Sequence, residues 1–250
     1  MTNDADEDGG NGTYTGMLVD IYDLIYPDPA GDIPVFVDFM RKAVQGTRVL
    51  EYGIGTGRIA IPLAEAGFHV TGTDISTEML SRLAEKDPTG RIDAHVSSFL
   101  EEPIAGTYDA VILMINTIFV ANSLDQQLAV FTNAAAHLTD EGFFLVETFN
   151  PNDYHNQTSP MLSMRQIAPT TVIFEQFIVD PASQLYVAQN LVLGAADKHS
   201  YVQVLRYMFP FEMDAIALNT GLVLKARMSD WVGTPYTSTS SRCVSLYRKA

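Results

Sequence analysis

The sequence is poor in the features that mark secreted, membrane-spanning and metal-binding proteins. Its one cysteine, Cys243, has no partner for an internal disulfide, which agrees with a reducing compartment. No apolar run approaches the roughly 18 residues that cross a bilayer. Residues 1–12 are acidic and polar, whereas a secretory signal is basic and then apolar. We therefore expect a soluble, cytoplasmic protein. We expect no zinc site, because no pair of histidines stands at ligand spacing.

The first 40 residues contain nine Asp or Glu residues and no Lys or Arg. The whole chain has a formal net charge of −15. Proteins bind nucleic acids through basic patches that neutralise phosphates, so we expect no nucleic-acid partner. The 250 residues, 47% of them hydrophobic, suffice for one core with an appendage. Composition does not indicate which substrate the protein binds. It is compatible with a homodimer.

The pattern of apolar residues divides the chain into five parts. Residues 1–15 have little to bury, so we expect a disordered acidic tail. Residues 16–45 hold two amphipathic helices, over 17–26 and 33–44. Between 46 and 150, strands and helices alternate with short loops, which is typical of βαβ units and a mainly parallel sheet.

The last two parts break this alternation. Residues 151–208 predict an antiparallel insert with three extended segments, over 171–180, 185–193 and 199–206. Residues 209–250 predict a helix and two strands that complete the core sheet, the last of them, 244–248, as an edge strand.

The strongest chemical pattern lies in residues 49–76. Gly53, Gly55 and Gly57 join a predicted buried strand to a predicted helix. Glycine lets the backbone turn sharply and approach a ligand closely, and parallel sheets bind ligands at the carboxyl ends of their strands. Asp74 ends the next strand, 21 residues after Gly53, where an acid can accept both ribose hydroxyls of an adenosine. The segment therefore predicts a site for an adenosine cofactor.

The spacing of the glycines distinguishes between the adenosine cofactors. A dinucleotide site requires the pattern G-x-G-x-x-G/A, in which the last residue is small. Arg58 occupies that last position here, where its side chain would crowd a pyrophosphate. The Gly-Lys-Ser/Thr of a P-loop is missing. A glycine-rich turn in some other α/β domain is the remaining alternative, and the register of strand, glycines, helix, strand and acid argues against it.

The run E-x-G-x-G-x-G over 51–57 resembles motif I of the class I S-adenosylmethionine-dependent methyltransferases. Segments 108–111 (Y-D-A-V) and 137–142 (H-L-T-D-E-G) are similar to later motifs of that family. Segment 205–210 (L-R-Y-M-F-P) and the C-terminal residues resemble a bacterial subgroup that modifies small molecules, amines and amino sugars among them. The resemblance implies an α/β fold: a Rossmann-like, mainly parallel seven-stranded sheet with helices on both faces. The antiparallel insert would then serve as a lid or platform.

The resemblance also implies the cofactor, S-adenosyl-L-methionine, and the residues that hold it. Glu51, Gly53 and Gly55 take its methionine end, and Asp74 takes the ribose. The other implied contacts are Gly57, Ile75, Met79, Ser98, Phe99 and Ile115. The sequence departs from the family at Ser98, where an acid usually stands at the adenine edge.

The sequence offers candidates for the chemistry rather than a catalytic signature. Methyl transfer depends on holding the nucleophile in a near-attack geometry, and a hydroxyl or carbon nucleophile also needs a base. His155, just past the carboxyl end of a core strand, is the first choice for that base, with a solvated loop histidine as the alternative. Tyr22, from the N-terminal segment, and Asn116, after the fourth core strand, are the other catalytic candidates.

The candidates for substrate binding are Tyr14, Glu147, Asn150, Tyr154 and Arg206. Glu147 and Asn116 are placed to accept a hydrogen bond from a substrate amine. Arg206 suits a substrate carboxylate or phosphate, or else a structural ion pair. Aromatic residues of the insert suit an apolar substrate of medium size, although a lid sheet must also bury a face.

The leading hypothesis is a small-molecule methyltransferase of bacterial secondary metabolism. An amine nitrogen is favoured over oxygen or carbon, because no clear base or metal site is visible. Two alternatives stay open. The departures at Ser98 and Asn116 are compatible with a fold that uses the cofactor for cyclisation, aminocarboxypropyl transfer or pericyclic chemistry. A non-catalytic binding subunit is the other, and the intact glycines and Asp74 argue against it.

Overall fold

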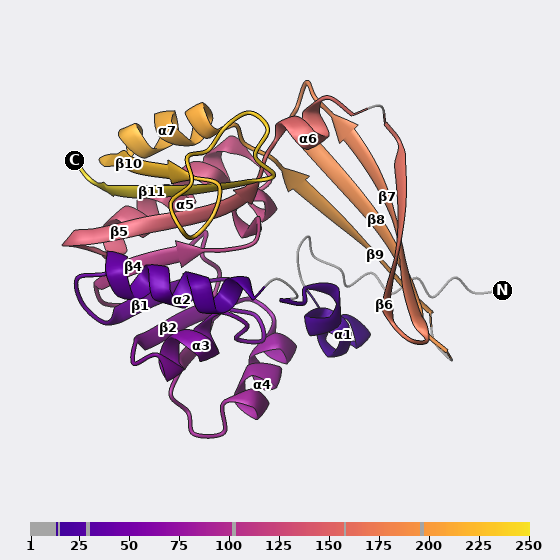
Figure 1. Cartoon of the computed structure of the whole chain (residues 1–250), viewed down its shortest axis with the longest axis horizontal. Coiled ribbons are helices and arrows are strands. Elements are labelled where there is room, and N and C mark those ends of the chain that lie inside the picture. Colours follow the sequence, from indigo (N-terminus) through magenta and orange to yellow (C-terminus); the bar gives the residue numbers. More distant parts are fainter. Residues whose placement is uncertain (1–13, 15, 29–30, 102–103, 158, 196–197) are drawn as a thin grey trace.

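The computed structural model describes the chain except residues 1–13, 15, 29–30, 102–103, 158 and 196–197. Figure 1 shows an α/β core, a second β-sheet that stands beside it, and helix α1 (Met17–Ile25) between the two. The predicted acidic tail lies outside the described residues, apart from Tyr14. No helix of the described residues is both long and apolar enough to cross a membrane.

The core sheet contains seven strands in the order β10-β11-β5-β4-β1-β2-β3. Strands β3, β2, β1, β4 and β5 run parallel to one another, and β11 is antiparallel to both β5 and β10. The expected Rossmann-like, mainly parallel sheet is therefore confirmed. The strand bounds are β1 Arg48–Tyr52, β2 His69–Asp74, β3 Asp93–Val96, β4 Tyr108–Leu113, β5 Leu138–Phe149, β10 Leu222–Met228 and β11 Arg242–Lys249.

Helices cover both faces of this sheet, because its central strands are apolar on both sides. On one face, Phe131 of α5 and Ile216 of α7 pack against Phe144. On the other, α2, α3 and α4 pack against the alternate residues, such as Ile112 and Leu145. The helix bounds are α2 Asp32–Ala43, α3 Ala60–Glu65, α4 Thr77–Lys86, α5 Leu124–His137, α6 Asn152–His155 and α7 Pro210–Asn219, with the short 3-10 helix η1 at Thr117–Val120.

The insert forms a separate antiparallel sheet in the order β6-β7-β8-β9. Its strands are β6 Met161–Ala168, β7 Thr171–Asp180, β8 Leu185–Leu193 and β9 Lys198–Arg206. An antiparallel meander was expected, but with three strands, and β6 was missed. It is an edge strand, exposed along most of its length, so it lacks the apolar alternation that reveals a strand in sequence.

The last strand of the chain was also predicted in the wrong place. Strand β11 is not an edge strand, because it lies between β5 and β10, and β10 forms the edge of the sheet. The residues of β11 are mostly buried, from Cys243 to Tyr247, as a strand with neighbours on both sides requires.

Candidate active site

The carboxyl end of β1 continues into the glycine turn, residues 53–57. Gly53 and Gly55 have φ angles of 68° and 54°, in the left-handed region that favours glycine. Asp74, at the end of β2, accepts hydrogen bonds from Gly55 N to Oδ2 and from Ser76 N to Oδ1, both at 2.9 Å. Burial raises the pKa of Asp74, and these hydrogen bonds partly oppose the rise. The carboxylate thus fixes the turn while lining the cavity above it.

Glu51 lies in β1 just before the turn and is buried. Its Oε2 accepts no hydrogen bond from the described residues. Burial raises the pKa of Glu51, the charge of Asp74 raises it further, and the charge of Arg58 lowers it. Buried polar atoms are nearly always paired, so this carboxylate oxygen remains available to a donor on a ligand.

The N-terminal strap, which we define as Tyr14 and residues 16–28, crosses the glycine turn. Ser76 Oγ donates to Tyr14 O at 2.7 Å, and Arg58 Nε donates to Tyr26 O at 3.0 Å. Ion pairs also join α1 to α4: Asp20 to Arg82 and Asp23 to Lys86. The strap is therefore fixed to the elements that follow β1 and β2.

Three tyrosines of the strap face the turn as a group. The ring of Tyr22 lies 5.3 Å from that of Tyr14 and 5.0 Å from that of Tyr26, measured between centroids. Burial raises the pKa of Tyr22, with a further rise from the neighbouring Tyr26. A phenol with a raised pKa keeps its proton at neutral pH, so Tyr22 can donate a hydrogen bond but is not a base.

The turn after β4 forms another wall. Ile115 and Asn116 have φ angles of 49° and 62°, a conformation that costs energy for residues other than glycine and that clusters at functional sites. Glu147 Oε2 accepts from Ile115 N at 3.2 Å, and Asn116 Oδ1 accepts from Phe149 N at 2.6 Å. These side chains hold the strained turn in place.

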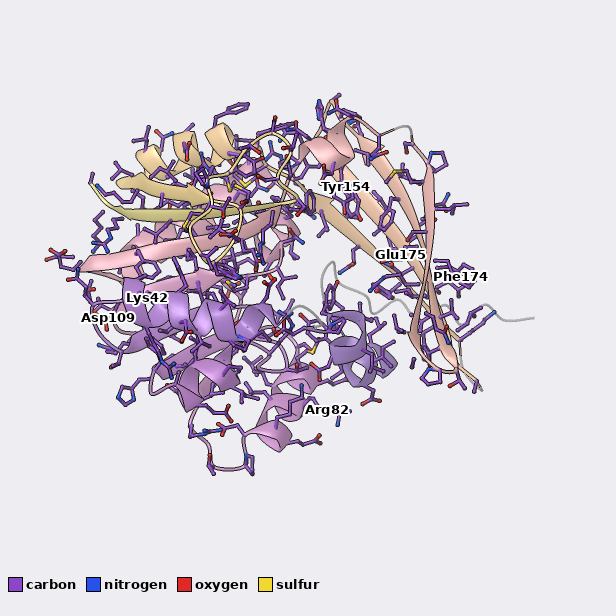
Figure 2. The ribbon with its side chains drawn as sticks, in the orientation of Figure 1. Lys42, Arg82, Asp109, Tyr154, Phe174 and Glu175 are labelled. Atoms are coloured by element: carbon purple, nitrogen blue, oxygen red, sulfur yellow. The ribbon has the colours of Figure 1, made fainter. Side chains whose placement is uncertain are left out.

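A cavity of about 380 Å³ lies between the glycine turn, the strap and the inner face of the β6–β9 sheet. The sheet residues along it are Ser163, Glu175, Phe177, Tyr186, Ala188, Asn190, Tyr201, Gln203 and Leu205. Figure 2 shows Tyr154 and Glu175 on the side of the sheet that faces the core, whereas Phe174 points away from it. The arrangement can enclose a cofactor against the core and a second molecule against the sheet.

Residues 49–142, from β1 to the middle of β5, match the family model of a methyltransferase domain. The chain is an S-adenosylmethionine-dependent methyltransferase. In amino-acid sequence, this methyltransferase is 26% identical to the cypemycin N-terminal methyltransferase of a Streptomyces species over 236 residues, which cover 91% of this chain and 94% of that protein.

Two solved structures extend the similarity to nearly the whole methyltransferase. The CcbJ methyltransferase from Streptomyces caelestis superposes with a TM-score of 0.85 at 29% identity, covering 93% of this chain and 96% of that one. CalS10, an amino pentose methyltransferase from Micromonospora echinaspora involved in calicheamicin biosynthesis, gives a TM-score of 0.75 at 18% identity, with 97% and 100% coverage. At that identity, the second comparison shows the shared fold alone.

The residues of the methyltransferase fit its cofactor. The backbone at Gly55 faces open space, where a Cβ would meet nothing within 4 Å. The unpaired Oε2 of Glu51 suits the cationic amino group of the methionine end, and the Asp74 carboxylate suits the ribose hydroxyls. Ile75, Met79 and Phe99 supply apolar lining for a purine ring.

Most predicted cofactor residues, two of the three predicted catalytic residues and two of the five predicted substrate residues line this cavity. Those that do are Tyr14, Tyr22, Gly53, Gly55, Asp74, Ile75, Met79, Phe99, Ile115, Asn116 and Tyr154. For Asn116, the proposed acceptor oxygen already accepts one hydrogen bond, from the backbone of Phe149, which leaves it one lone pair.

The structure places three other predicted cofactor residues away from the lining. Glu51 is buried in β1, just before the turn, and is not among the residues that line the cavity. A Cβ on Gly57 would lie 2.3 Å from Leu83 Cδ1, so Gly57 allows close packing of the turn against α4. Ser98 Oγ accepts from Leu100 N at 3.2 Å and so caps its own loop rather than facing the cavity.

His155, the first choice for a base, lies outside the cavity, as do three of the predicted substrate residues. His155 Nδ1 shares a hydrogen bond of 2.8 Å with the Tyr207 hydroxyl. Arg206 pairs with Glu212 at 2.6 Å, which favours its structural alternative. Asn150 is buried and bonded to the backbone of the 238–240 loop, and Glu147 pairs with Arg242 at 3.3 Å. All four belong to the framework around the site.

The sequence analysis missed most of the sheet lining, above all Glu175, Tyr186 and Tyr201. The pattern that could have found them is alternation, since side chains two residues apart on a strand share a face. Glu175 and Phe177 share a face of β7, as do Tyr186 and Ala188 of β8.

Gly55→Ala separates binding from stability. The new methyl group meets no atom, so we expect a loss of only about 1 kcal/mol of stability from the left-handed backbone. The same methyl enters the cavity and should weaken S-adenosylhomocysteine binding roughly tenfold, the equivalent of about 1.4 kcal/mol. Gly90→Ala is the matched control, with φ of 62° and nothing near its Cβ. Calorimetric titration and urea unfolding measure both effects; equal binding by the two variants would contradict the assignment.

Glu51→Gln should stabilise the ligand-free protein and weaken cofactor binding. Folding raises the pKa of the Glu51 carboxyl. Above the pKa that this group has in the unfolded chain, its burial therefore lowers the stability of the folded state, because a charge in the interior is unfavourable. We therefore expect the gain from Glu51→Gln to be largest above neutral pH and to shrink on acidification. Urea unfolding at several pH values tests this, with the exposed Glu141→Gln as control. A variant less stable than the wild type at pH 8 would refute it.

Proposed function

We propose that this methyltransferase acts on the nitrogen of a small-molecule amine in bacterial secondary metabolism. The observation that carries the proposal is the charge of the cavity. Asp74 and Glu175 are the charged side chains of the described lining, which contains no Lys, Arg or His. An acidic and aromatic cavity attracts an amine and repels an anionic acceptor. The names of the cypemycin N-terminal methyltransferase and the amino pentose methyltransferase point the same way.

S-adenosylmethionine, when bound, supplies an electrophilic methyl group and leaves as S-adenosylhomocysteine. In this proposal Glu51, Gly53 and Gly55 hold its methionine end, and Asp74 holds the ribose. Tyr22, protonated, donates a hydrogen bond beside them. Residues 16–45 cap the cofactor that the core of 46–150 binds, and the insert of 151–208 closes the cavity over the acceptor, which excludes water and orients the amine.

An amine needs orientation and desolvation more than it needs a base, and this agrees with the described site. His155 is engaged outside the cavity, and Tyr22 keeps its proton. The described residues also contain no group of three or more His, Cys, Asp or Glu that would hold a metal ion. The site is therefore suited to a neutral amine, which attacks without a base among these residues.

Incubation with methyl-labelled S-adenosylmethionine and a panel of small amines, phenols and carbon acids tests the proposal. We expect label on an amine nitrogen and S-adenosylhomocysteine as the spent cofactor. Transfer to phenols alone, abolished by a chelator, would refute the choice of nitrogen. Release of methylthioadenosine would instead favour the alternative reactions of the same cofactor.

A further inference from the structure

The inner face of the β6–β9 sheet carries a row of polar side chains that its role as a cover does not require. Ser163, Glu175, Asn190 and Tyr201 lie directly opposite one another in the register of the four strands, and all four line the cavity. If this face of the sheet served only to pack against the core, we would expect apolar side chains at these central positions. The row crosses the sheet at one level and contains its acidic lining residue.

Glu175 is only partly compensated within this row. The described residues give it a hydrogen bond from Ser163 Oγ to Oε2 at 3.0 Å and an ion pair with Arg165 at 3.6 Å. That ion-pair distance is longer than a charge-assisted hydrogen bond. Arg165 is itself half-exposed and donates from Nη1 to Ile25 O. The carboxylate therefore presents negative charge to the cavity while 18% of its side chain is exposed.

Four tyrosines line the same cavity as this carboxylate, and we call them the tyrosine cage: Tyr26, Tyr154, Tyr186 and Tyr201. They come from the end of α1 and from α6, β8 and β9, and all line the cavity. Burial raises the pKa of each phenol, and the charge of Glu175 raises it further, so the field of Glu175 reaches all four. Being protonated, the rings stay neutral and offer their π-faces.

A carboxylate among neutral aromatic rings is an arrangement that binds organic cations. Ring faces attract ammonium groups within about 6 Å of their centroids, and the attraction grows when water is excluded. Tyr154 and Tyr186 are set edge to face with centroids 4.8 Å apart, and Phe177 stacks on Tyr186 at 5.3 Å. This packing fixes the orientation of the rings before a ligand arrives.

We propose that Glu175 and the tyrosine cage bind the acceptor amine in its cationic, ammonium form, which gives up its proton to water before the neutral nitrogen attacks the methyl group. The inference rests on the proposed function and narrows its substrate class to amines with a basic nitrogen. It assigns specificity to the insert: Glu175 selects the positive charge, and the rings select alkylated nitrogen over a hydrated inorganic cation. Weakly basic amides and anilines, which stay neutral in water, are not recognised in this way.

A quaternary ammonium ion tests the cage without any methyl transfer, because its nitrogen cannot accept a methyl group. We would titrate choline, and its neutral carbon isostere 3,3-dimethylbutan-1-ol, into the full chain loaded with S-adenosylhomocysteine, following ligand signals by NMR. We expect choline to bind roughly tenfold more tightly than the isostere. In Glu175→Gln, choline binding should weaken roughly tenfold while the binding of the isostere stays unchanged.

Glu141→Gln, an identical change on an exposed side chain at the far end of β5, should leave both affinities as they are. Tyr201→Leu removes one ring face and Tyr201→Phe keeps it, so only the first should weaken choline binding. This pair tests the cage even if Glu175→Gln does not fold. Binding of S-adenosylhomocysteine and a thermal melt check that each variant is intact.

The possible outcomes separate this inference from the proposed function. Equal affinity for choline and the isostere, or full choline binding by Glu175→Gln or Tyr201→Leu, overturns the cage. If labelled methyl still reaches amines, the proposed function stands without it. Selective choline binding combined with transfer only to oxygen or carbon would show a cation site, and would overturn both the choice of nitrogen and the claim that the cage holds the acceptor nitrogen.

Discussion

Asp74→Ala should weaken the binding of S-adenosylmethionine and S-adenosylhomocysteine more than 100-fold. The carboxylate holds Gly55 N and Ser76 N at 2.9 Å and, in our assignment, accepts both ribose hydroxyls. Each hydrogen bond to a charged group contributes about 1.5–3 kcal/mol, so the loss of two to the ligand alone amounts to about 3 kcal/mol or more. Calorimetric titration of the purified variant measures the change.

The binding should also respond to pH in a defined direction. Burial raises the pKa of Asp74, so acidification should weaken cofactor binding at a higher pH than an exposed aspartate would require. Asp93→Ala, which removes an exposed acid at the start of β3, is the matched control and should show the same affinity and the same pH dependence as the wild type. Affinity within fivefold of the wild type in Asp74→Ala would show that the ribose contact is misassigned.

Arg242→Ala should destabilise the protein by about 3 kcal/mol, because it leaves the carboxylate of Glu147, whose side chain is only 12% exposed, without its cation. Arg242 also pairs with Asp32 at 2.9 Å and lies over the ring of Trp231 at 5.1 Å. Through Glu147 it supports the strained turn at Ile115. Urea unfolding at pH 8 gives the size of the loss, and Arg248→Ala on the same strand serves as control.

The protonation of Glu147 determines how the destabilisation caused by Arg242→Ala changes with pH. Burial raises the pKa of this carboxyl, and the charge of Arg242 lowers it. Without Arg242 the pKa rises further, so the buried charge is most unfavourable at high pH and is relieved by protonation as the pH falls. We expect the destabilisation to shrink between pH 8 and pH 5 and to be partly reversed by adding Glu147→Gln. A loss independent of pH and of Glu147 would mean that the packing on Trp231 dominates.

The similarity to other methyltransferases covers both sheets, not the cofactor-binding core alone. The family model ends at residue 142, whereas the likeness to CcbJ covers 93% of the chain. The insert is therefore part of the shared architecture. In our assignment the core supplies the cofactor site and the insert supplies most of the other lining, so we expect differences in acceptor to arise in β6–β9 and α6.

Local sequence determined the cofactor side of this protein. The three glycines, the acid at Asp74 and the alternation of buried strands with helices are short-range features, and each has its physical cause within a few residues. Left-handed φ angles favour glycine, and a parallel sheet brings the ends of β1 and β2 together whatever surrounds them. For this reason the glycine turn and the sheet were predictable without a structure.

The acceptor side was decided by tertiary structure. Alternation along a strand says that Glu175 and Phe174 lie on opposite faces, but not which face meets the core, and strand β6 carried no pattern at all. His155 had the sequence position of a base. In the structure it is hydrogen-bonded to Tyr207, 52 residues away in the chain, and it lies outside the cavity. Contacts between distant residues depend on how the two sheets pack, and that packing decides which side chains meet the substrate.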